Sequence, residues 1–435
     1  MSKKSNGAEK ARKIILFLSD LKKGAEEQTY TCPDGSKVVG TQTNEAPVNY
    51  LLKAYPDVCE VLCIVTPVAE KSGAFEKLKT AIDKVTVKDI TFDGKDFAAG
   101  PLAEIMSRMK KGDEILLDTT GGLRDAIMQL LLVSRALSFS GIPTVGAVYA
   151  NYGAKQIVDC SHLIGLFDLV GGMQEMASFG SVKTLREYYN EETAEPEVKA
   201  LLDAMEELQE NITLCRTGKL DACIKKFSEA MEGVESCEDP LVKALLPAFQ
   251  DKFDKKLNIP GLIRWCINSD MLQQALTLYK ERIPIFILKD RTDDLVERKP
   301  LEDMESWAQK NFTKDLSEKK DYETDEEFIF RRYLSLNWIQ RQLENQKQPE
   351  KVKLKSSYLY IKCFSDQLRD IIMDYQYIRM LRNMINHAQE QGAQSQRQQM
   401  EYLAGFGYKP LDEVGAEDIR VALERGLENL KKRGE

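Results

Sequence analysis

Short apolar runs alternate with amphipathic, helix-like stretches over roughly the first 170 residues. The apolar runs are four to eight residues long and rich in Val, Ile and Leu, which is typical of buried strands. Strands that alternate with helices predict a parallel, Rossmann-like sheet, here with an antiparallel edge. The predicted strands are Ile14–Leu18, a hairpin over Thr29–Val39 with a Pro-Asp-Gly turn, Val58–Val65, Val87–Phe92, Glu114–Asp118, Thr144–Ala150 and Gln156–Ile164; the predicted helices are Glu45–Tyr55, Ala74–Val85, Pro101–Met109 and Leu123–Phe139.

Strand patterns nearly vanish after Leu166, and helical spacing takes over. Leu201, Met205, Leu208 and Ile212 follow i, i+4, i+7, i+11, which places them on one face of a helix. The pattern therefore predicts an α/β domain over residues 1–170, a connector over 171–190 and an all-α region over 191–435. Further helices are predicted at Met271–Ile283, ending before Pro284, at Phe328–Leu343 and at Leu368–Ala388, with loops at Glu323–Glu327 and around Pro349.

Composition excludes several classes of protein. Nine cysteines without a CxxC pair indicate reduced thiols, and two histidines exclude a multi-histidine metal centre. A net charge of −8 argues against a broad basic face for nucleic acid, and Lys347–Lys355 fits a solvated loop better than a binding patch. No apolar run approaches the ~20 residues that span a bilayer. The run Ile14–Leu18 is too short for a signal-peptide core, so we expect a cytoplasmic protein without membrane partners.

The first motif with a chemical meaning follows the strand Glu114–Asp118. The loop Thr119-Thr120-Gly121-Gly122 leads into a helix that begins near Leu123, with Arg124 in its first turn. Glycines let the backbone approach a ligand, and a helix N-terminus presents free N–H groups to phosphate. Ser19 and Asp20 end the first strand and reach the same edge if the two strands are neighbours. We therefore predict a ligand site there, formed by Ser19, Asp20, Thr119, Thr120, Gly121, Gly122 and Arg124.

That motif is neither GxGxxG nor GxxxxGK[ST], so an ordinary dinucleotide fold and a P-loop kinase are both unsupported. An ordinary strand–helix turn with a threonine N-cap remains the alternative reading.

The second motif is Arg382-Asn383-x3-His387 on a predicted helix. Asn383 and His387 lie one turn apart, away from an apolar arc that includes Leu381 and Ile385. Arg382 falls near the edge of that arc and about 140° from His387 around the helix. Long side chains, or a second copy of the helix across a two-fold axis, would have to bring the two together. A helix-end arginine with an unrelated polar-face histidine is the alternative, and His162 is predicted to be structural in an edge strand.

Both motifs, in this order, resemble those of a known family. Asp118–Arg124 resembles the ligand loop of CARF domains (CRISPR-associated Rossmann fold), and Arg382-Asn383-x3-His387 resembles the R-x4-H signature of HEPN ribonucleases. Gln274–Pro284 is similar to a recurrent helix of such proteins. The resemblance identifies the chain with the CARF–HEPN accessory ribonucleases of type III CRISPR systems.

The resemblance implies a homodimer linked in function to a type III interference complex. Cyclic oligoadenylate, as the tetra- or hexa-adenylate, would bind the loop residues and activate cleavage of single-stranded RNA without a metal or other cofactor. His387 would act as general base or acid, Arg382 would stabilise the phosphorane, and Asn383 would orient His387 or the phosphate. The alternatives are a ring nuclease that degrades the cyclic messenger, a catalytically dead scaffold, and a ligand-sensing transcription regulator, for which no basic recognition helix is evident.

Overall fold

The chain forms two compact units, Met1–Val170 and Gly171–Glu435. The computed structural model describes residues 11–121, 125–189, 194–238, 242–243, 247, 251, 257–290, 296–299, 327, 334–345, 351–354, 357–361, 365–387 and 394–431. Among these residues no helix is long and apolar enough to cross a membrane.

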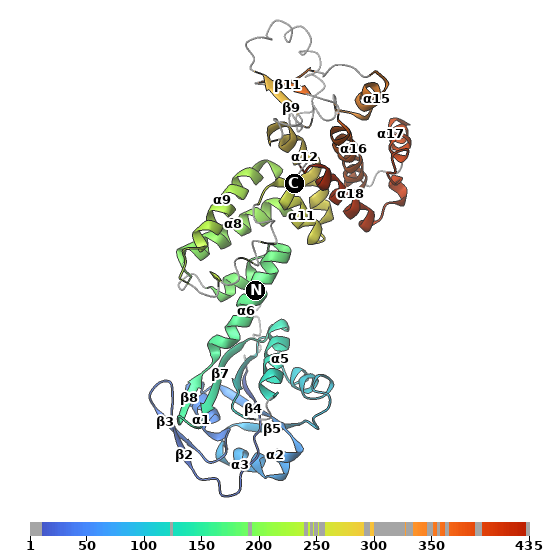
Figure 1. Ribbon diagram of the computed structural model, residues 1–435. Coiled ribbons are helices and arrows are strands. Elements are labelled where there is room, and N and C mark those ends of the chain that lie inside the picture. The colour runs from blue at the N-terminus through green and yellow to red at the C-terminus, as the bar shows by residue number, and fades with distance from the viewer. Residues whose placement is uncertain are drawn as a thin grey trace, which may run out of the picture. The chain divides into compact units, whose positions relative to one another are not determined.

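The N-terminal unit is built on one eight-stranded sheet with the order β3-β2-β8-β7-β6-β1-β4-β5 (Figure 1). The five strands from β7 to β5 are parallel, whereas β8 is antiparallel to β7 and β2–β3 is an antiparallel hairpin. The predicted Rossmann-like sheet with an antiparallel edge is confirmed. The strands are β1 (Arg12–Phe17), β2 (Gln28–Thr31), β3 (Lys37–Gly40), β4 (Val58–Val65), β5 (Thr86–Thr91), β6 (Glu114–Asp118), β7 (Thr144–Asn151) and β8 (Gln156–Asp159).

Helices cover both faces of this sheet, which explains why its central strands carry buried apolar side chains on both faces. Ile14 and Leu16 of β1 point to one face, while Ile15 and Phe17 point to the other, and all four are buried. Side chains of α1 and α3 fill the first face, and side chains of α4 and α5 fill the second. The helices of this unit are α1 (Glu45–Ala54), α2 (Pro67–Lys71), α3 (Ala74–Ala81), the π-helix η1 (Ala98–Leu102), α4 (Ala103–Ser107) and α5 (Ala126–Phe139).

The prediction of a strand over Gln156–Ile164 is wrong in its second half. The strand β8 ends at Asp159, and α6 (Ser161–Phe179) begins two residues later. The Asp159 carboxylate accepts a hydrogen bond from the Ser161 backbone N–H, 2.8 Å long, which helps to start the helix. His162 therefore lies exposed on a helix and not in an edge strand. The division between the two units falls inside α6.

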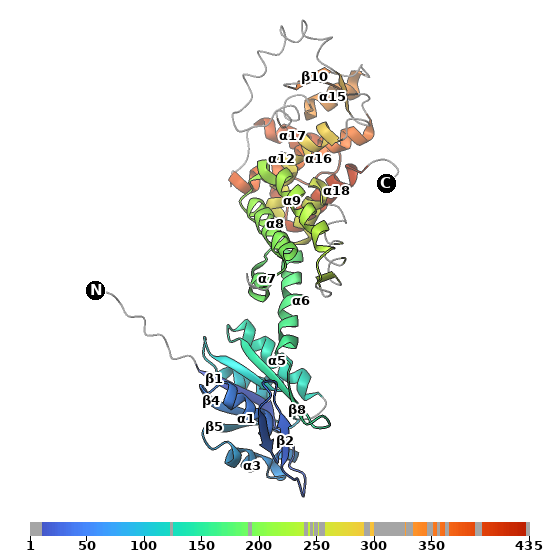
Figure 2. The ribbon, with the colours of Figure 1, turned by 90° about the vertical axis from the view of Figure 1, so that its left-hand side faces the viewer.

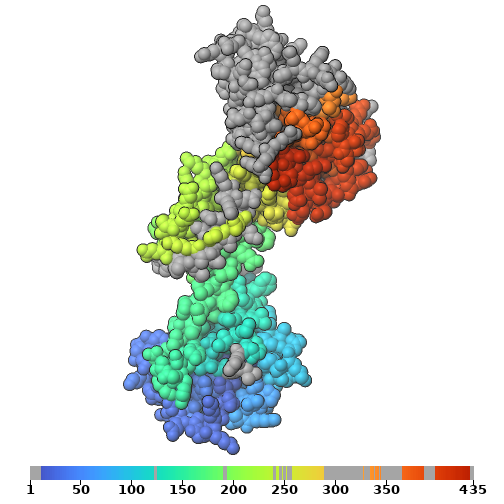
Figure 3. Space-filling view, viewed as in Figure 1, coloured from blue at the N-terminus to red at the C-terminus, as the bar shows by residue number. Residues whose placement is uncertain are grey.

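The C-terminal unit is mostly helical. The helices α8 and α9 lie side by side in two perpendicular views (Figures 1 and 2), and the surface of α16–α18, orange to red, forms one packed body in Figure 3. Its elements after α6 are α7 (Lys183–Tyr188), α8 (Pro196–Thr213), the 3-10 turn η2 (Thr217–Lys219), α9 (Leu220–Val234), α11 (Ile259–Asn268), α12 (Leu272–Asp290), α15 (Leu336–Asn345), α16 (Asp366–His387), α17 (Gln394–Ala404), the 3-10 turn η5 (Leu411–Glu413) and α18 (Ala416–Asn429).

The centre of this unit is α16, which packs against α12, α15 and α18. Every side chain from position 371 to position 378 is buried, so the helix has no solvent face over two turns. Its buried carboxylate, Asp374, accepts hydrogen bonds from Tyr408 Oη (2.8 Å), Arg425 Nε (2.8 Å) and Asn429 Nδ2 (2.7 Å). Arg425 and Asn429 hold α18 against α16 through this carboxylate. The three donors partly offset the effect of burial, which raises the pKa of Asp374.

The predicted helical character of this unit is confirmed, but two details of the prediction are wrong. The region is not purely α-helical, because β9 (Val296–Lys299), β10 (Lys351–Leu354) and β11 (Ser357–Ile361) form a small antiparallel sheet. The strand β10 lies inside Lys347–Lys355, which the sequence analysis interpreted as a solvated loop, although its alternation of lysine with Val352 and Leu354 is a strand signal.

The helix α12 continues through Pro284 to Asp290. An interior proline costs a helix about 3 kcal/mol. Burial of Ile283, Ile287 and Leu288 on either side offsets that cost. Of the predicted helix Phe328–Leu343, the part over 328–333 lies outside the described residues, as do 323–326 of the acidic run and Pro349.

Candidate functional site

The carboxyl ends of β1 and β6 form the natural ligand edge of the sheet. After β1 the chain forms the edge hairpin β2–β3, then adds the parallel strands β4 and β5 on one side of β1 and later β6 and β7 on the other. The order of the parallel strands therefore reverses at β1. In open α/β sheets ligands bind at such a switch point. The two strands are parallel neighbours with Leu16 opposite Asp118, which places Ser19 and Thr119 at the same edge.

A buried hydrogen-bond network ties this edge together. Asn44, the N-cap residue of α1, donates from Nδ2 to Asp118 Oδ2 (2.7 Å) and to the Phe17 carbonyl (3.1 Å). Its Oδ1 accepts from the Ser19 backbone N–H at 3.0 Å. The other oxygen of Asp118 accepts from the Thr120 backbone N–H at 2.9 Å. Because Asn44 and Asp118 are fully buried, they hold the two loops in one fixed arrangement.

The sequence reading missed Asn44 and its partner Gln42. Gln42 Nε2 donates to the Ser19 carbonyl (3.0 Å), and its Oε1 accepts from the Asn44 backbone N–H (2.6 Å). The only local signal was an asparagine just before a predicted helix, which indicates an N-cap and nothing about a sheet edge.

Burial raises the pKa of Asp118 to about 6, against the lowering effect of the Thr120 and Asn44 donors. The folded state therefore binds this proton more tightly than the unfolded state does. The protonated Asp118 side chain therefore stabilises the fold by about 3 kcal/mol below pH 4, and this contribution is lost as the pH rises from about 4 to about 6. Urea unfolding of wild type and Asp118→Asn checks this. The unfolding free energy of wild type minus that of Asp118→Asn should fall over that pH interval and then stay level. A difference that does not change with pH would contradict the burial argument.

The two threonine hydroxyls face the sheet. Thr119 Oγ1 donates to the Val148 carbonyl (3.0 Å), and Thr120 Oγ1 accepts from the Ala150 backbone N–H (2.8 Å). The second bond leaves the Thr120 hydroxyl proton available for another acceptor.

Gly121 packs against the network without room for a side chain. A Cβ at this position would lie 2.3 Å from the Phe17 carbonyl oxygen and 2.6 Å from Asn44 Nδ2. Gly122 and Arg124, which complete the predicted loop, lie outside the described residues. Asp20 is exposed and Ser19 is half-buried at the same edge.

An exposed aromatic side chain stands near this edge. Thr120 is bonded to Ala150 in β7, and the turn after β7 carries Tyr152, which is 65% exposed. Lys155 Nζ lies 3.4 Å from the centre of the Tyr152 ring. The turn therefore adds a cation and an aromatic face beside the loop after β6.

The second predicted site lies on the last two turns of α16. Arg382 and Asn383 are half-buried, and the helix ends at His387, whose side chain is outside the described part of the structure. Ile385 is 39% exposed and does not continue the apolar arc, because the helix leaves the core at this end. Asn386 Oδ1 accepts a hydrogen bond from Gln273 Nε2 of α12 at 3.4 Å.

Arg382 is a half-buried cation near this helix end. Its side chain is 19% exposed, and Nη2 lies 3.7 Å from Glu281 Oε1 of α12. Its Nε is buried and has no acceptor among the described residues. A buried donor without an acceptor is costly in a folded protein, so this guanidinium is suited to an anionic ligand that completes its hydrogen bonds.

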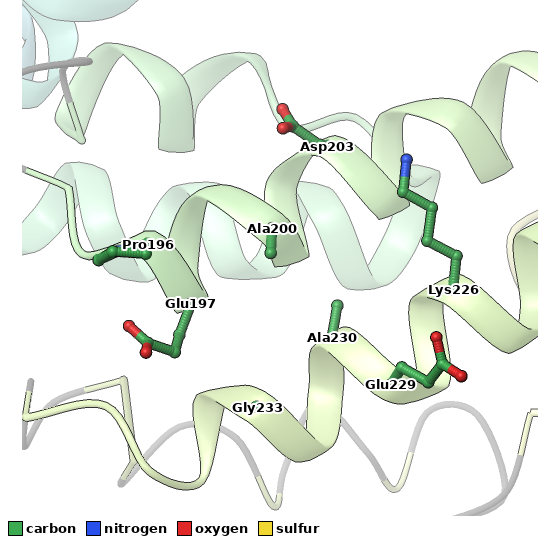
Figure 4. A pocket seen from close by; sticks show the side chains of 8 residues that line it. All are labelled: Pro196, Glu197, Ala200, Asp203, Lys226, Glu229, Ala230 and Gly233. Atoms are coloured by element: carbon green, nitrogen blue, oxygen red, sulfur yellow. The ribbon is translucent and has the colours of Figure 1, made fainter.

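A groove of about 500 Å³ between α8 and α9 is a less suitable site (Figure 4). Glu197, Asp203 and Glu229 line it together with one cation, Lys226. Lys226 is already paired with Glu207 at 2.7 Å, so the groove does not favour phosphate. No group of three metal-ligating side chains occurs within the part of the chain that the structure describes.

Comparison with solved structures gives a likeness over nearly the whole chain. No family model and no curated protein sequence matches. Among solved structures, Enterococcus italicus Csm6 bound to cyclic hexa-2'-fluoro-hexa-dAMP matches over 97% of this chain and 96% of that chain, with 11% sequence identity and a TM-score of 0.36. At that TM-score the likeness carries no argument for function, which we build on the residues above.

Proposed function

We propose that the chain is an endoribonuclease that cleaves single-stranded RNA without a metal and is activated by cyclic oligoadenylate in type III CRISPR defence. The observation that carries the proposal is the half-buried Arg382, which lies on the same helix end as Asn383 and His387. Its Nε has no acceptor among the residues that the structure describes. An RNA phosphate would supply that acceptor.

The chemistry follows from the three side chains. The RNA 2′-OH attacks the adjacent phosphorus, the P–O5′ bond breaks, and the products carry a 2′,3′-cyclic phosphate and a 5′-OH. His387 takes the proton from the 2′-OH or gives one to the leaving 5′ oxygen, since imidazole titrates near neutral pH. Arg382 stabilises the charge that develops on the phosphorane, and Asn383 orients His387 or the phosphate.

The edge of the N-terminal sheet is the proposed site for the cyclic activator. Ser19, Thr120 and Gly121 provide polar and close-approach positions there, and Tyr152 offers an aromatic face on which adenine can stack. The fixed network below the loop supports binding, because a preorganised loop loses little freedom when the ligand arrives. Asp20, Thr119, Gly122 and Arg124 remain part of this proposed site.

We infer that two copies of the chain associate through the N-terminal unit. Exposed apolar residues line one side of α5, the helix that follows the proposed ligand loop, and a neighbouring stretch of α6. Arg135 and Asp168 form a 2.6 Å ion pair that joins the two helices. A two-fold ring of adenylates matches a two-fold dimer at this edge. The exposed residues are Met128, Leu132 and Phe139 of α5 and Leu163, Phe167 and Val170 of α6.

Leu132→Glu should therefore turn a dimer into a monomer, because it places a charge at a position that a partner would bury. Light scattering coupled to size exclusion gives the mass directly. Exposed Ile385 of α16 provides the matched control, since Ile385→Glu leaves the face on α5 and α6 intact. A dimer that survives Leu132→Glu would contradict this interface.

The test of the reaction class is an analysis of product ends. Single-stranded RNA is incubated with the protein and cyclic oligoadenylate in EDTA, and the fragments are examined by mass spectrometry. We expect 2′,3′-cyclic phosphate and 5′-OH ends, and no fragments with Arg382→Ala. Fragments with 3′-OH and 5′-phosphate ends, or cleavage that EDTA stops, would contradict the proposed chemistry.

A further inference from the structure

Three consecutive charged residues of α12 reach different neighbours in the C-terminal unit. Lys280 Nζ pairs with Glu327 Oε1 at 2.9 Å, and the buried Arg282 pairs with Asp221 of α9. Glu281 lies between them and is 22% exposed. Its Oε2 accepts a hydrogen bond from Thr217 Oγ1, 2.7 Å long.

The remaining oxygen of Glu281 faces the proposed catalytic arginine. Glu281 Oε1 lies 3.7 Å from Arg382 Nη2 and 3.8 Å from Lys280 Nζ. The two helices are pinned at this level, because Tyr375 Oη of α16 donates to the Lys280 carbonyl of α12 at 3.2 Å. The carboxylate is thus held from one side by the turn between α8 and α9, and Arg382 meets it from the other.

We propose that Glu281 is a positioning residue for Arg382 and that the Thr217 hydroxyl sets its orientation. The inference rests on the proposed RNA cleavage at Arg382. A carboxylate that is fixed through one oxygen cannot follow the guanidinium when RNA enters, so it restrains the Nη2 end. The contact at 3.7 Å is an ion pair and not a full hydrogen bond. The Nε, which has no acceptor in the described part of the chain, stays available for a phosphate oxygen.

A restrained guanidinium matters because charge stabilisation is most effective when the donor is in place before the charge develops. Arginine is otherwise a long side chain with about 2 kcal/mol of rotamer entropy. Loss of the restraint should therefore reduce the rate of the chemical step more than it reduces the affinity for RNA. A displacement of about 1 Å at a reacting centre can cost about 100-fold in rate.

The experiment measures kcat and KM for RNA with saturating cyclic oligoadenylate. Glu281→Gln keeps the shape and the Thr217 bond but removes the charge, and Thr217→Val keeps the shape but removes the hydroxyl. Thr217→Ser restores the hydroxyl. Glu207→Gln is the matched control, because it removes an exposed ion pair with Lys226 on α8 and α9.

We expect Glu281→Gln to lower kcat by about 10- to 100-fold with KM within about twofold of wild type. Thr217→Val should lower kcat in the same direction, Thr217→Ser should return to wild type, and Glu207→Gln should match wild type. If Thr217 only stabilised the fold, the two variants Thr217→Val and Thr217→Ser would not differ in kcat at an unchanged KM.

Three results would overturn the inference. The first is that Glu281→Gln keeps the wild-type kcat. The second is that Thr217→Ser and Thr217→Val lose kcat equally. The third is that Glu281→Gln cleaves RNA faster than wild type when no activator is present. The last would make Glu281 a restraint that blocks Arg382. Arg382→Ala is measured in parallel: if it too keeps wild-type activity, the proposed function fails, whereas its inactivity beside a normal Glu281→Gln rejects the positioning role alone.

Discussion

His387→Ala should lower activator-dependent RNA cleavage by about 1,000-fold. Removal of a general acid or base typically costs 10²- to 10⁴-fold, because the proton must then move to or from water. The cyclic activator binds at the edge of the N-terminal sheet in our proposal, so its affinity should stay unchanged. The measurement is the initial rate of cleavage of a fluorogenic single-stranded RNA, together with the dissociation constant of the ring by calorimetry.

The matched control is His162→Ala, since His162 is the chain's other histidine and lies exposed on α6. It should cleave RNA at the wild-type rate. If His387→Ala retained wild-type cleavage, His387 would have no part in proton transfer and the second motif would be an ordinary helix end.

Gly121→Ala should lower the affinity for the cyclic activator by roughly 10- to 100-fold. The added Cβ would lie 2.3 Å from the Phe17 carbonyl oxygen, so the loop after β6 must move away from the end of β1. Such overpacking typically costs about 1–3 kcal/mol, which corresponds to that range in a dissociation constant. Calorimetric titration with the cyclic tetra- and hexa-adenylates measures the change.

Gly100→Ala provides the control for a glycine substitution in the same unit. A Cβ at Gly100 meets no atom within 4 Å, and we expect wild-type affinity. If Gly121→Ala bound the ring as tightly as wild type, the loop after β6 would not contact the ligand.

The sheet was predictable because each central strand carries its own signal. The apolar runs of β1, β4 and β6 are buried on both faces, so their assignment does not depend on knowing their neighbours. The pairing of β1 with β6 is different, since about 100 residues separate the two strands and no local pattern encodes it. Sequence reasoning could state only that Ser19 would reach the loop after β6 if those strands were adjacent.

The residues that support the two sites were not predictable, because, like the pairing of β1 with β6, their contacts join positions far apart in the sequence. Asn44 reaches Asp118 across 74 positions of sequence, and Glu281 of α12 reaches Arg382 of α16 across 101 positions. Both contacts depend on tertiary packing, which a motif does not contain. Local rules also failed where packing overrode them, as at Pro284 inside α12.

The most direct test of the central claim is RNA cleavage as a function of the activator. A fluorogenic single-stranded RNA is incubated with the protein in EDTA. The samples contain no activator, cyclic tetra-adenylate, cyclic hexa-adenylate or the matching linear oligoadenylates. The cyclic oligoadenylates are also examined for conversion to linear products. We predict that one ring size raises the cleavage rate strongly and that the other samples stay near background. Equal cleavage in all samples, or none with either ring, would contradict an RNA-cleaving enzyme that cyclic oligoadenylate activates.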